Sequence, residues 1–127
     1  MKQTKDIFVY IEVRHESVMD VSYQLLTQAH LLKNQYKAKG IDHQVVAVIC
    51  AEDASPFVDD CFKYGADRII VCEHKNLAFP TSQYTSKVLT QVIKENKPEC
   101  VLIGATVVGR DIAPRIAISV DTGLTAD

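Results

Sequence analysis

The stretch Val45–Cys50 (VVAVIC) consists of apolar residues only, and four of its six side chains are β-branched. A strand with one face in water alternates apolar and polar residues, whereas a strand covered on both faces is apolar throughout. The stretch therefore predicts a central strand of a parallel sheet that carries helices on both faces.

Three further runs resemble this one, and an amphipathic stretch follows each of the four. The runs are Ile7–Val13 (IFVYIEV), Arg68–Cys72 (RIIVC) and Cys100–Ile103 (CVLI). Strands that alternate with helices in this way predict right-handed crossovers and a mainly parallel sheet. We expect a three-layer, Rossmann-like α/β fold in a single domain over residues 1–127, and the strand order stays open.

The expected helices are bounded by capping and breaking residues. Hydroxyl side chains that can cap a helix predict three starts, and glycine or a residue before proline predicts three ends. The starts are Ser17, Ser55 (with Pro56 in the first turn) and Thr81; the ends are Gly40, Gly65 and Lys97 before Pro98. We expect Pro114 in the first turn of the last helix, where its missing N–H does no harm.

Apolar residues at spacings of three and four predict the inner face of each helix. The expected inner residues are Val18, Val21, Leu25, Ala29, Leu32 and Tyr36 in the first helix; Phe57, Cys61 and Phe62 in the second; Tyr84, Thr85, Val88, Leu89, Val92 and Ile93 in the third; Ile112, Ile116 and Val120 in the fourth.

Charge and composition exclude several classes of protein. The chain has 14 basic and 16 acidic residues, a net charge of −2, so we expect no binding to nucleic acid or to an anionic membrane. The charged start Met1–Asp6 does not resemble a signal peptide, and no apolar run reaches the length of a membrane helix. We expect a cytoplasmic protein with four unpaired cysteines.

Ligands of open parallel sheets bind beyond the carboxyl ends of the strands. The turns expected there are Arg14–Ser17, Ala51–Ser55, Glu73–Pro80 and Gly104–Asp111. The last is the best candidate, because two glycines precede a helix whose N-terminal amides favour an anion. Its candidate ligand-binding residues are Gly104, Thr106, Gly109 and Arg110.

The spacing of Gly104–Asp111, G-x-x-x-x-G-R-D, is similar to that of a phosphate-binding P-loop. The match fails at two positions: Arg110 replaces the lysine, and Asp111 replaces the hydroxyl residue that holds magnesium. We therefore favour a tight strand-to-helix turn, with Asp111 as a cap, Gly109 for close packing and Arg110 as an interface residue.

The remaining polar residues form no catalytic constellation. His15 and Glu16 could line a cleft, and Glu52 and Asp53 could meet a ribose, but solvated loop residues and helix-start acids are the favoured interpretations. His30, His43 and His74 have no partners at metal-ligand spacing, and no G-x-S-x-G motif is present. We expect neither a metal site nor a catalytic residue.

The carboxyl-terminal segment from Lys97 to Asp127 resembles the amino-terminal domain of the electron transfer flavoprotein alpha subunit. The strings that carry the resemblance are Leu102–Thr106, Gly109–Asp111, Ala113–Arg115 and Thr122–Asp127, with Val9–Glu12, Val21–Leu26, Tyr64–Asp67 and Tyr84–Val88 earlier in the chain. The resemblance therefore covers nearly the whole chain.

The resemblance implies an electron carrier and not an enzyme. In that family an alpha and a beta subunit carry electrons from flavin dehydrogenases to an acceptor oxidoreductase, and some members bifurcate electrons. It implies that FAD is held mainly by a carboxyl-terminal domain beginning after Asp127, so that this chain binds no flavin by itself. The chain would be the platform that packs against the beta subunit. No flavin ligand of the family falls on a residue of this chain.

Two further expectations follow. A platform separated from its partners should expose an apolar patch through which it self-associates. The alternative function is a stand-alone adenine-nucleotide-binding module of the universal-stress or alpha-hydrolase type. Such a module would hold phosphate at Gly104–Gly109 and ribose at the end of the second strand.

Overall fold

A computed structural model describes residues 6–14, 16–77 and 81–119 of the chain. The main strands are β1 (Ile7–Ile11), β4 (Val45–Ala51), β5 (Arg68–Glu73) and β6 (Cys100–Leu102), and a short hairpin is made by β2 (Val13–Arg14) and β3 (Ser17–Val18). The helices are α1 (Asp20–Ala38), α2 (Val58–Lys63), α3 (Ser82–Asn96) and α4 (Val107–Ser119), with single 3₁₀ turns at η1 (Ser55–Phe57) and η2 (Lys75–Leu77).

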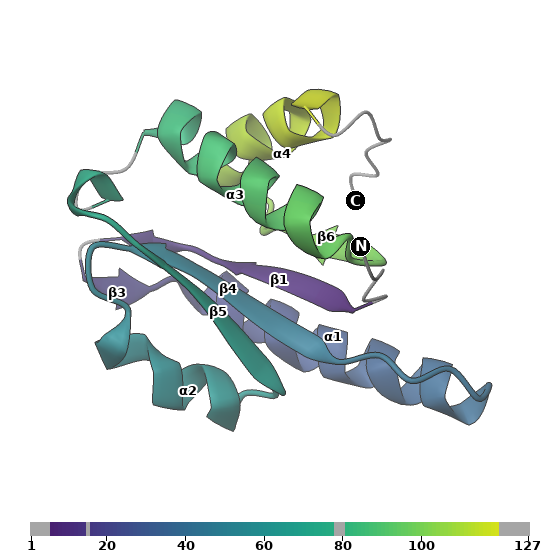
Figure 1. The fold of residues 1–127 in the computed structure, drawn as a ribbon. Helices are drawn as coiled ribbons and strands as arrows, with labels where there is room; N and C mark the ends of the chain where they lie inside the picture. The colour runs from purple at the N-terminus through teal and green to yellow at the C-terminus, as the bar shows by residue number, and fades with distance from the viewer. Residues whose placement is uncertain (1–5, 15, 78–80, 120–127) are drawn as a thin grey trace.

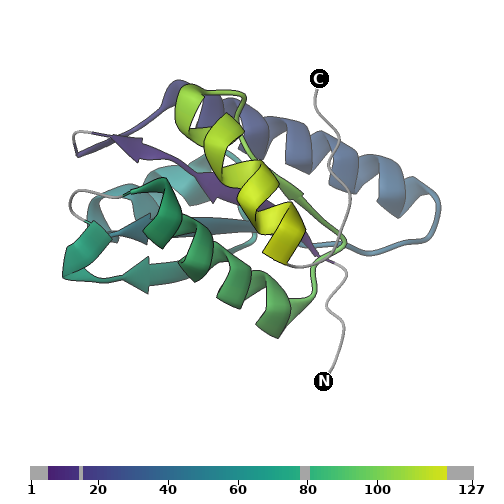
Figure 2. The same cartoon turned by 90° about the horizontal axis from the view of Figure 1, so that it is seen from above.

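The four main strands form a parallel sheet in the order β5-β4-β1-β6. Helices α1 and α2 cover one face and α3 and α4 cover the other, as Figures 1 and 2 show. The predicted three-layer α/β fold is therefore confirmed. The order also shows what the sequence left open: the chain moves outward from β1 to β5, then crosses to the other side of β1 to form β6.

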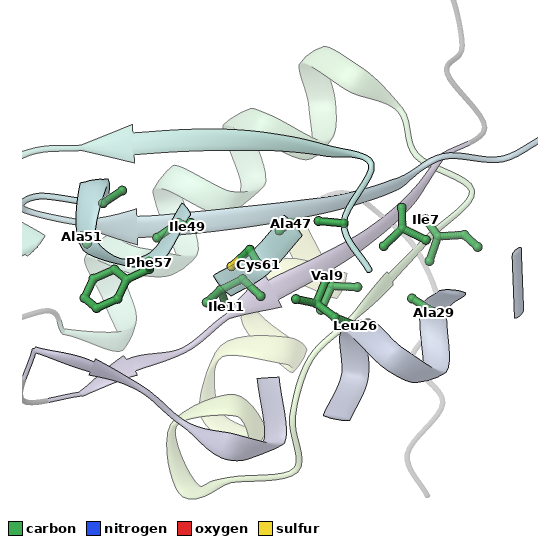
Figure 3. Close-up of a cluster of buried hydrophobic side chains, with 13 residues drawn as sticks. Ile7, Val9, Ile11, Leu26, Ala29, Ala47, Ile49, Ala51, Phe57 and Cys61 are labelled. Carbon is green, nitrogen blue, oxygen red and sulfur yellow. The ribbon is translucent and has the colours of Figure 1, made fainter. Parts of the chain in front are cut away.

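Each face of the sheet has its own hydrophobic core, because alternate residues of a strand point to opposite faces. Ile7, Val9 and Ile11 of β1 pack with α1 and α2, in the cluster drawn in Figure 3. Phe8 and Tyr10 pack with α3 and α4. All seven residues of β4 are buried, as the apolar stretch Val45–Cys50 predicted.

The predicted start of the first helix at Ser17 is wrong. Ser17 and Val18 form β3, paired with Val13 and Arg14, and the helix begins at Asp20 with Met19 as its N-cap. The Met19 N–H donates to the carbonyl of Glu12 at 2.9 Å. The backbone after Ser17 therefore makes hydrogen bonds to the first strand segment, where the sequence predicted the first turn of a helix. The fully buried helix positions are Ser22, Leu26 and Ala29, of which only Ala29 was expected.

Two details of α2 also differ from expectation. Ser55 lies inside a 3₁₀ turn whose N-cap is Ala54, because the Asp53 carboxylate accepts the Ser55 N–H at 3.0 Å. Phe57 and Cys61 are buried as expected, but Phe62 is 48% exposed. Phe62 directly follows the buried Cys61, and neighbouring residues of a helix point about 100° apart, so Phe62 points away from the sheet that Cys61 faces.

The prediction for Pro114 is wrong as well, because α4 starts earlier than expected. The helix begins at Val107, which places Pro114 in its interior and Asp111 in its second turn, not at its cap. Ile112 and Ile116 are buried as predicted, and Val120 lies outside the described residues.

The other boundaries are confirmed. Thr81 is the N-cap of α3, with its hydroxyl accepting the Tyr84 N–H at 3.1 Å, and Lys97 ends that helix in the left-handed conformation. Gly40 and Gly65 follow their helices with φ of +81° and +124°. Within the described part of the chain, no helix has both the length and the apolar character needed to cross a membrane.

Candidate functional site

A cleft of about 1010 Å³ opens at the carboxyl ends of β1 and β4, between these strands and the first turns of α3 and α4. This is the edge at which open parallel sheets bind their ligands. Its lining includes Tyr10, Arg14, Ala51, Thr81 and Val108. All four predicted turns contribute: the β2–β3 hairpin, the segment after β4, the segment after β5 through Leu77, and the segment Gly104–Asp111 through Val108.

Glu12 is the central residue of this edge. It lies one position beyond β1, is 3% exposed, and connects three segments of the fold. Its Oε1 accepts a hydrogen bond from Thr106 Oγ1 at 2.6 Å, and its backbone N–H donates to Ser22 Oγ of α1 at 2.8 Å. Its carbonyl accepts the Met19 N–H. Glu12 therefore joins β1, the start of α1 and the turn before α4.

Arg14 neutralises Glu12 from the side of the cleft. Its Nε lies 2.8 Å from Glu12 Oε2, an ion pair that lacks the alignment of a hydrogen bond. The Arg14 side chain is 37% exposed and that of Glu12 is 4% exposed, so the guanidinium reaches solvent while the carboxylate is buried. A buried carboxylate with this partner is tolerated where an unpaired one would not be.

The turn before α4 is closed by its own residues. Thr106 is the first residue before the helix, and its Oγ1 accepts the Gly109 N–H at 2.9 Å while its carbonyl accepts the Arg110 N–H at 2.8 Å. A Cβ atom on Gly109 would overlap the carbonyl oxygen of Gly104. Gly109 is thus required for close approach of the helix to the turn.

These facts locate the four candidate ligand-binding residues. Gly104 and Gly109 are buried, Thr106 is half-buried and engaged by both Gly109 and Glu12, and the Arg110 side chain is exposed. None of the four lines the cleft; their helix contributes Val108 instead. Whether any of them touches a ligand stays a prediction.

The rim of the cleft is acidic. Its lining contains four acidic residues and one basic residue, Arg14. The acidic residues are Glu12, Glu16, Glu52 and Asp53. Hydrogen bonding to Ser55 holds the pKa of the Asp53 carboxyl below its usual range. Glu16 has φ of +63°, an uncommon conformation for a residue other than glycine. Carboxylates at such a rim disfavour the approach of a phosphate group, because like charges repel.

Residues of β1 and of the start of α3 also line the cleft. Burial raises the pKa of the Tyr10 phenol, and the neighbouring Cys50 and Glu12 add to the effect, so Tyr10 stays neutral at any ordinary pH. Opposite, α3 contributes Ser82 and Thr85 beside its cap Thr81. Hydrogen bonding to Ser82 lowers the pKa of the Asp111 carboxyl, which links α3 to α4.

The histidines are dispersed. His15 lies outside the described residues. His30 packs against Gly65, His43 is buried with its ring edge-on to Tyr36, and His74 lies beside Tyr84. No three His, Cys, Asp or Glu side chains of the described segments are grouped so as to hold a metal ion.

Sequence reasoning missed Glu12 and Tyr10 as members of this site. The signal was present, since Glu12 is the one charged residue inside the apolar run Ile7–Val13. A carboxylate in such a run is costly unless it is paired, so its position at the strand end indicated a polar partner from another segment.

Comparison with known proteins gives a consistent result. The sequence model of the family described as "Electron transfer flavoprotein domain" matches residues 7–127. The chain is 37% identical to the electron transfer flavoprotein subunit alpha of Thermoanaerobacterium thermosaccharolyticum over 127 residues, which are 100% of this chain and 37% of that protein.

Two other relatives carry different names. The acryloyl-CoA reductase electron transfer subunit beta of Anaerotignum propionicum is 37% identical over 123 residues, covering 97% of this chain and 32% of that protein. Protein FixB of Rhizobium meliloti is 34% identical over 123 residues, covering 97% and 35%. The chain spans about a third of the length of the curated relatives it matches.

Proposed function

Because this chain belongs to the electron transfer flavoprotein family, we propose that it is the amino-terminal domain of an alpha subunit and serves as a scaffold in an electron carrier. The redox chemistry belongs to FAD, which the family's carboxyl-terminal domain of the alpha subunit would hold. This domain would supply position and a docking surface for the beta subunit. It needs no acid, base or nucleophile of its own.

The observation that carries the proposal is the hydrogen bond between Thr106 and Glu12. The turn Gly104–Asp111 is the place where a nucleotide-binding module would receive a phosphate. Here the Thr106 hydroxyl is engaged by a buried carboxylate at 2.6 Å and by the Gly109 amide. The groups of this turn therefore bind other parts of the protein, and a phosphate placed there would face the Glu12 carboxylate. This supports a structural role for Gly104, Thr106 and Gly109.

The surface offers apolar side chains for docking. Among the residues that the structure describes, the exposed large apolar ones are Leu31, Ile41, Phe62, Tyr64, Val71 and Val107, and Val107 is the most exposed of them at 84%. Tyr64 lies beside α1, because its ring stacks on Tyr23 with the ring centroids 4.4 Å apart. Single exposed apolar residues are normal on a protein surface, and only a contiguous patch marks a protein–protein contact, so the role of these residues in docking is a proposal.

The alternative function is a module that binds an adenine nucleotide. The charges of the cleft bear on this alternative, because the nucleotide would have to bind there. Four carboxylates and one ion-paired arginine surround the space in which its phosphates and ribose would lie. Asp53 and Glu52 could accept hydrogen bonds from a ribose, but the phosphates would lack a cationic partner. The scaffold proposal therefore agrees better with the charges of the cleft.

One experiment separates the two functions. The 127-residue chain would be purified alone and after co-expression with the beta subunit, and its parent alpha subunit after co-expression with the beta subunit. Each sample would be examined by absorbance and by nucleotide release on denaturation. We expect flavin bands in the parent complex and none on the 127-residue chain, which still co-purifies with beta. Flavin or adenine nucleotide released from the chain alone would overturn the scaffold role.

The docking surface is tested by charge insertion. Val107→Glu and Phe62→Glu each place a carboxylate on one exposed apolar position, on opposite faces of the sheet. Lys63→Glu, beside Phe62, serves as a control for added negative charge. Loss of beta binding by one apolar variant, with unchanged circular dichroism, would identify the face; retained binding by both would refute docking through these residues.

A further inference from the structure

Two cysteines lie side by side on neighbouring strands of the parallel sheet. Cys50 of β4 and Cys72 of β5 are partners in the register of the parallel sheet. Both side chains belong to the hydrophobic cluster on the α3 and α4 face, so they point the same way. Neighbouring strands are about 4.8 Å apart, which lies inside the range of Cα separations that a disulfide spans.

The two thiols differ in environment. Cys50 is 4% exposed on an inner strand, whereas Cys72 is half-buried on β5, at the edge of the sheet. The interaction with Cys50 lowers the pKa of the Cys72 thiol, whereas the interaction with Cys72 and burial raise the pKa of the Cys50 thiol. The outer, half-buried thiol is thus the more readily ionised of the two.

The other cysteines lack this arrangement. Burial raises the pKa of Cys61, on α2, to about 11. Cys100 is half-buried on β6, the opposite edge of the same sheet, and burial raises its pKa too. Cys100 thus resembles Cys72 in exposure and in strand position and differs from it in having no in-register cysteine beside it.

We propose that Cys50 and Cys72 are a reversible redox pair, in which Cys72 is the thiolate that a hydroperoxide oxidises and Cys50 is the thiol that resolves it. The Cys72 sulfur attacks the peroxide, the O–O bond breaks, and sulfenic acid and hydroxide form. The Cys50 sulfur then displaces the sulfenic oxygen, which leaves as water. Two thiols lose two electrons, and hydrogen peroxide is reduced to two waters.

The position of the pair connects it to the cleft. Cys50 is followed by Ala51, Glu52 and Asp53, which line the cleft. Cys72 is followed by Glu73, whose Oε2 accepts the Ala54 N–H at 2.9 Å just behind that rim. A disulfide would tie the two strands one residue before these contacts. The inference does not depend on the proposed function, since it rests on the sheet register and the thiols alone.

The first test uses the unaltered chain. Under native conditions, a trace of iodoacetamide followed by peptide mass spectrometry ranks the four thiols. We expect Cys72 to react on the order of tenfold faster than Cys100, because the thiolate is the reactive form. Equal rates for Cys72 and Cys100, at their similar burial, would overturn the proposal.

The second test adds hydrogen peroxide and needs substitutions. We expect an intramolecular Cys50–Cys72 linkage that dithiothreitol reverses, in the unaltered chain and in the control Cys100→Ser. In Cys50→Ala the unresolved sulfenic acid on Cys72 should be trapped by dimedone, and in Cys72→Ala no thiol should react. A linkage between two chains, or dimedone labelling of another cysteine instead, would refute the pair.

Discussion

Thr106 Oγ1 and Glu12 Oε1 are hydrogen-bonded at 2.6 Å although 94 positions separate them in the chain. The bond joins the end of the first main strand to the start of the last described helix. It brings a carboxylate into the turn that, by spacing alone, resembles a phosphate site. The hydrogen bond between Thr106 and Glu12 thus stabilises the contact between these two segments, and the Glu12 carboxylate disfavours a phosphate at this turn.

Replacing Thr106 by Val should destabilise the chain by about 2 kcal/mol. The substitution removes the N-cap of α4 and leaves the Glu12 carboxylate with one partner fewer in a buried place. Urea unfolding followed by circular dichroism measures the loss. The control Thr27→Val removes a hydroxyl that only donates to the Tyr23 carbonyl on an exposed helix surface, and should change the free energy by less than about 0.5 kcal/mol. Equal effects of the two substitutions would contradict the role of Thr106.

Replacing Gly109 by Ala should cost about 3 kcal/mol or prevent folding. A Cβ atom there overlaps the Gly104 carbonyl, and backbone cannot move aside as a flexible side chain can. Gly40→Ala is the matched control, because no atom lies within 4 Å of its Cβ position and only its φ of +81° disfavours alanine. We expect about 1 kcal/mol there. Thermal unfolding of both variants would show the difference, and a Gly109→Ala as stable as Gly40→Ala would disprove the close contact.

Thr81 and Ser17 allow a direct comparison of two capping predictions. Thr81→Ala should cost about 1 kcal/mol, because the hydroxyl accepts the Tyr84 N–H at the start of α3. Ser17→Ala should cost less than about 0.5 kcal/mol, since Ser17 lies in a hairpin and only donates to the Arg14 carbonyl at 3.3 Å. Chemical denaturation of the two variants is the measurement. A larger loss for Ser17→Ala would mean that the helix begins where the sequence suggested.

Asp67 should make stability depend on pH in the acid range. Burial opposes ionisation, but Lys33 at 2.7 Å and the Val45 N–H at 2.9 Å outweigh it and lower the pKa of the Asp67 carboxyl. A lowered folded-state pKa gives stability that is complete above the unfolded-state value of about 3.9 and is lost as the pH falls through the folded-state value. The partial exposure of the pair limits the effect to about 0.5–1 kcal/mol.

Asp67→Asn tests this contribution. The variant should be less stable than the unaltered chain at neutral pH, and the two should converge as the pH falls below the unfolded-state pKa. Asp42→Asn removes a carboxylate from an exposed loop position and is the control for the loss of one negative charge; it should change the free energy of unfolding at neutral pH by less than about 0.5 kcal/mol. A difference at Asp67 that stays constant down to the lowest pH would show that ionisation is not its cause.

The fold class was predictable because burial on both faces leaves a continuous apolar run, and Val45–Cys50 carries that signal by itself. Helix ends marked by local chemistry were predictable too: Thr81 caps its helix, and Gly65 takes a conformation that other residues avoid. The predicted starts at Ser17 and Ser55 were wrong because other groups bind the backbone there. At Ser17 the backbone pairs with the strand Val13–Arg14, and at Ser55 the N–H donates to the Asp53 carboxylate.

The sequence alone thus determined which segments form the four main strands and the helices that follow them, and that the main sheet is parallel, since both depend on local propensity and on the period of apolar residues. Only the tertiary structure decided the strand order, the acidic cleft and the pairing of Glu12 with Thr106 and of Cys50 with Cys72. Each of these depends on which distant segments become neighbours. The free energy that favours one such arrangement is a sum over many long-range contacts, and no local sequence pattern reveals that sum. A carboxylate in an apolar strand indicated that a partner was needed, and the folded chain showed that the partner was Thr106.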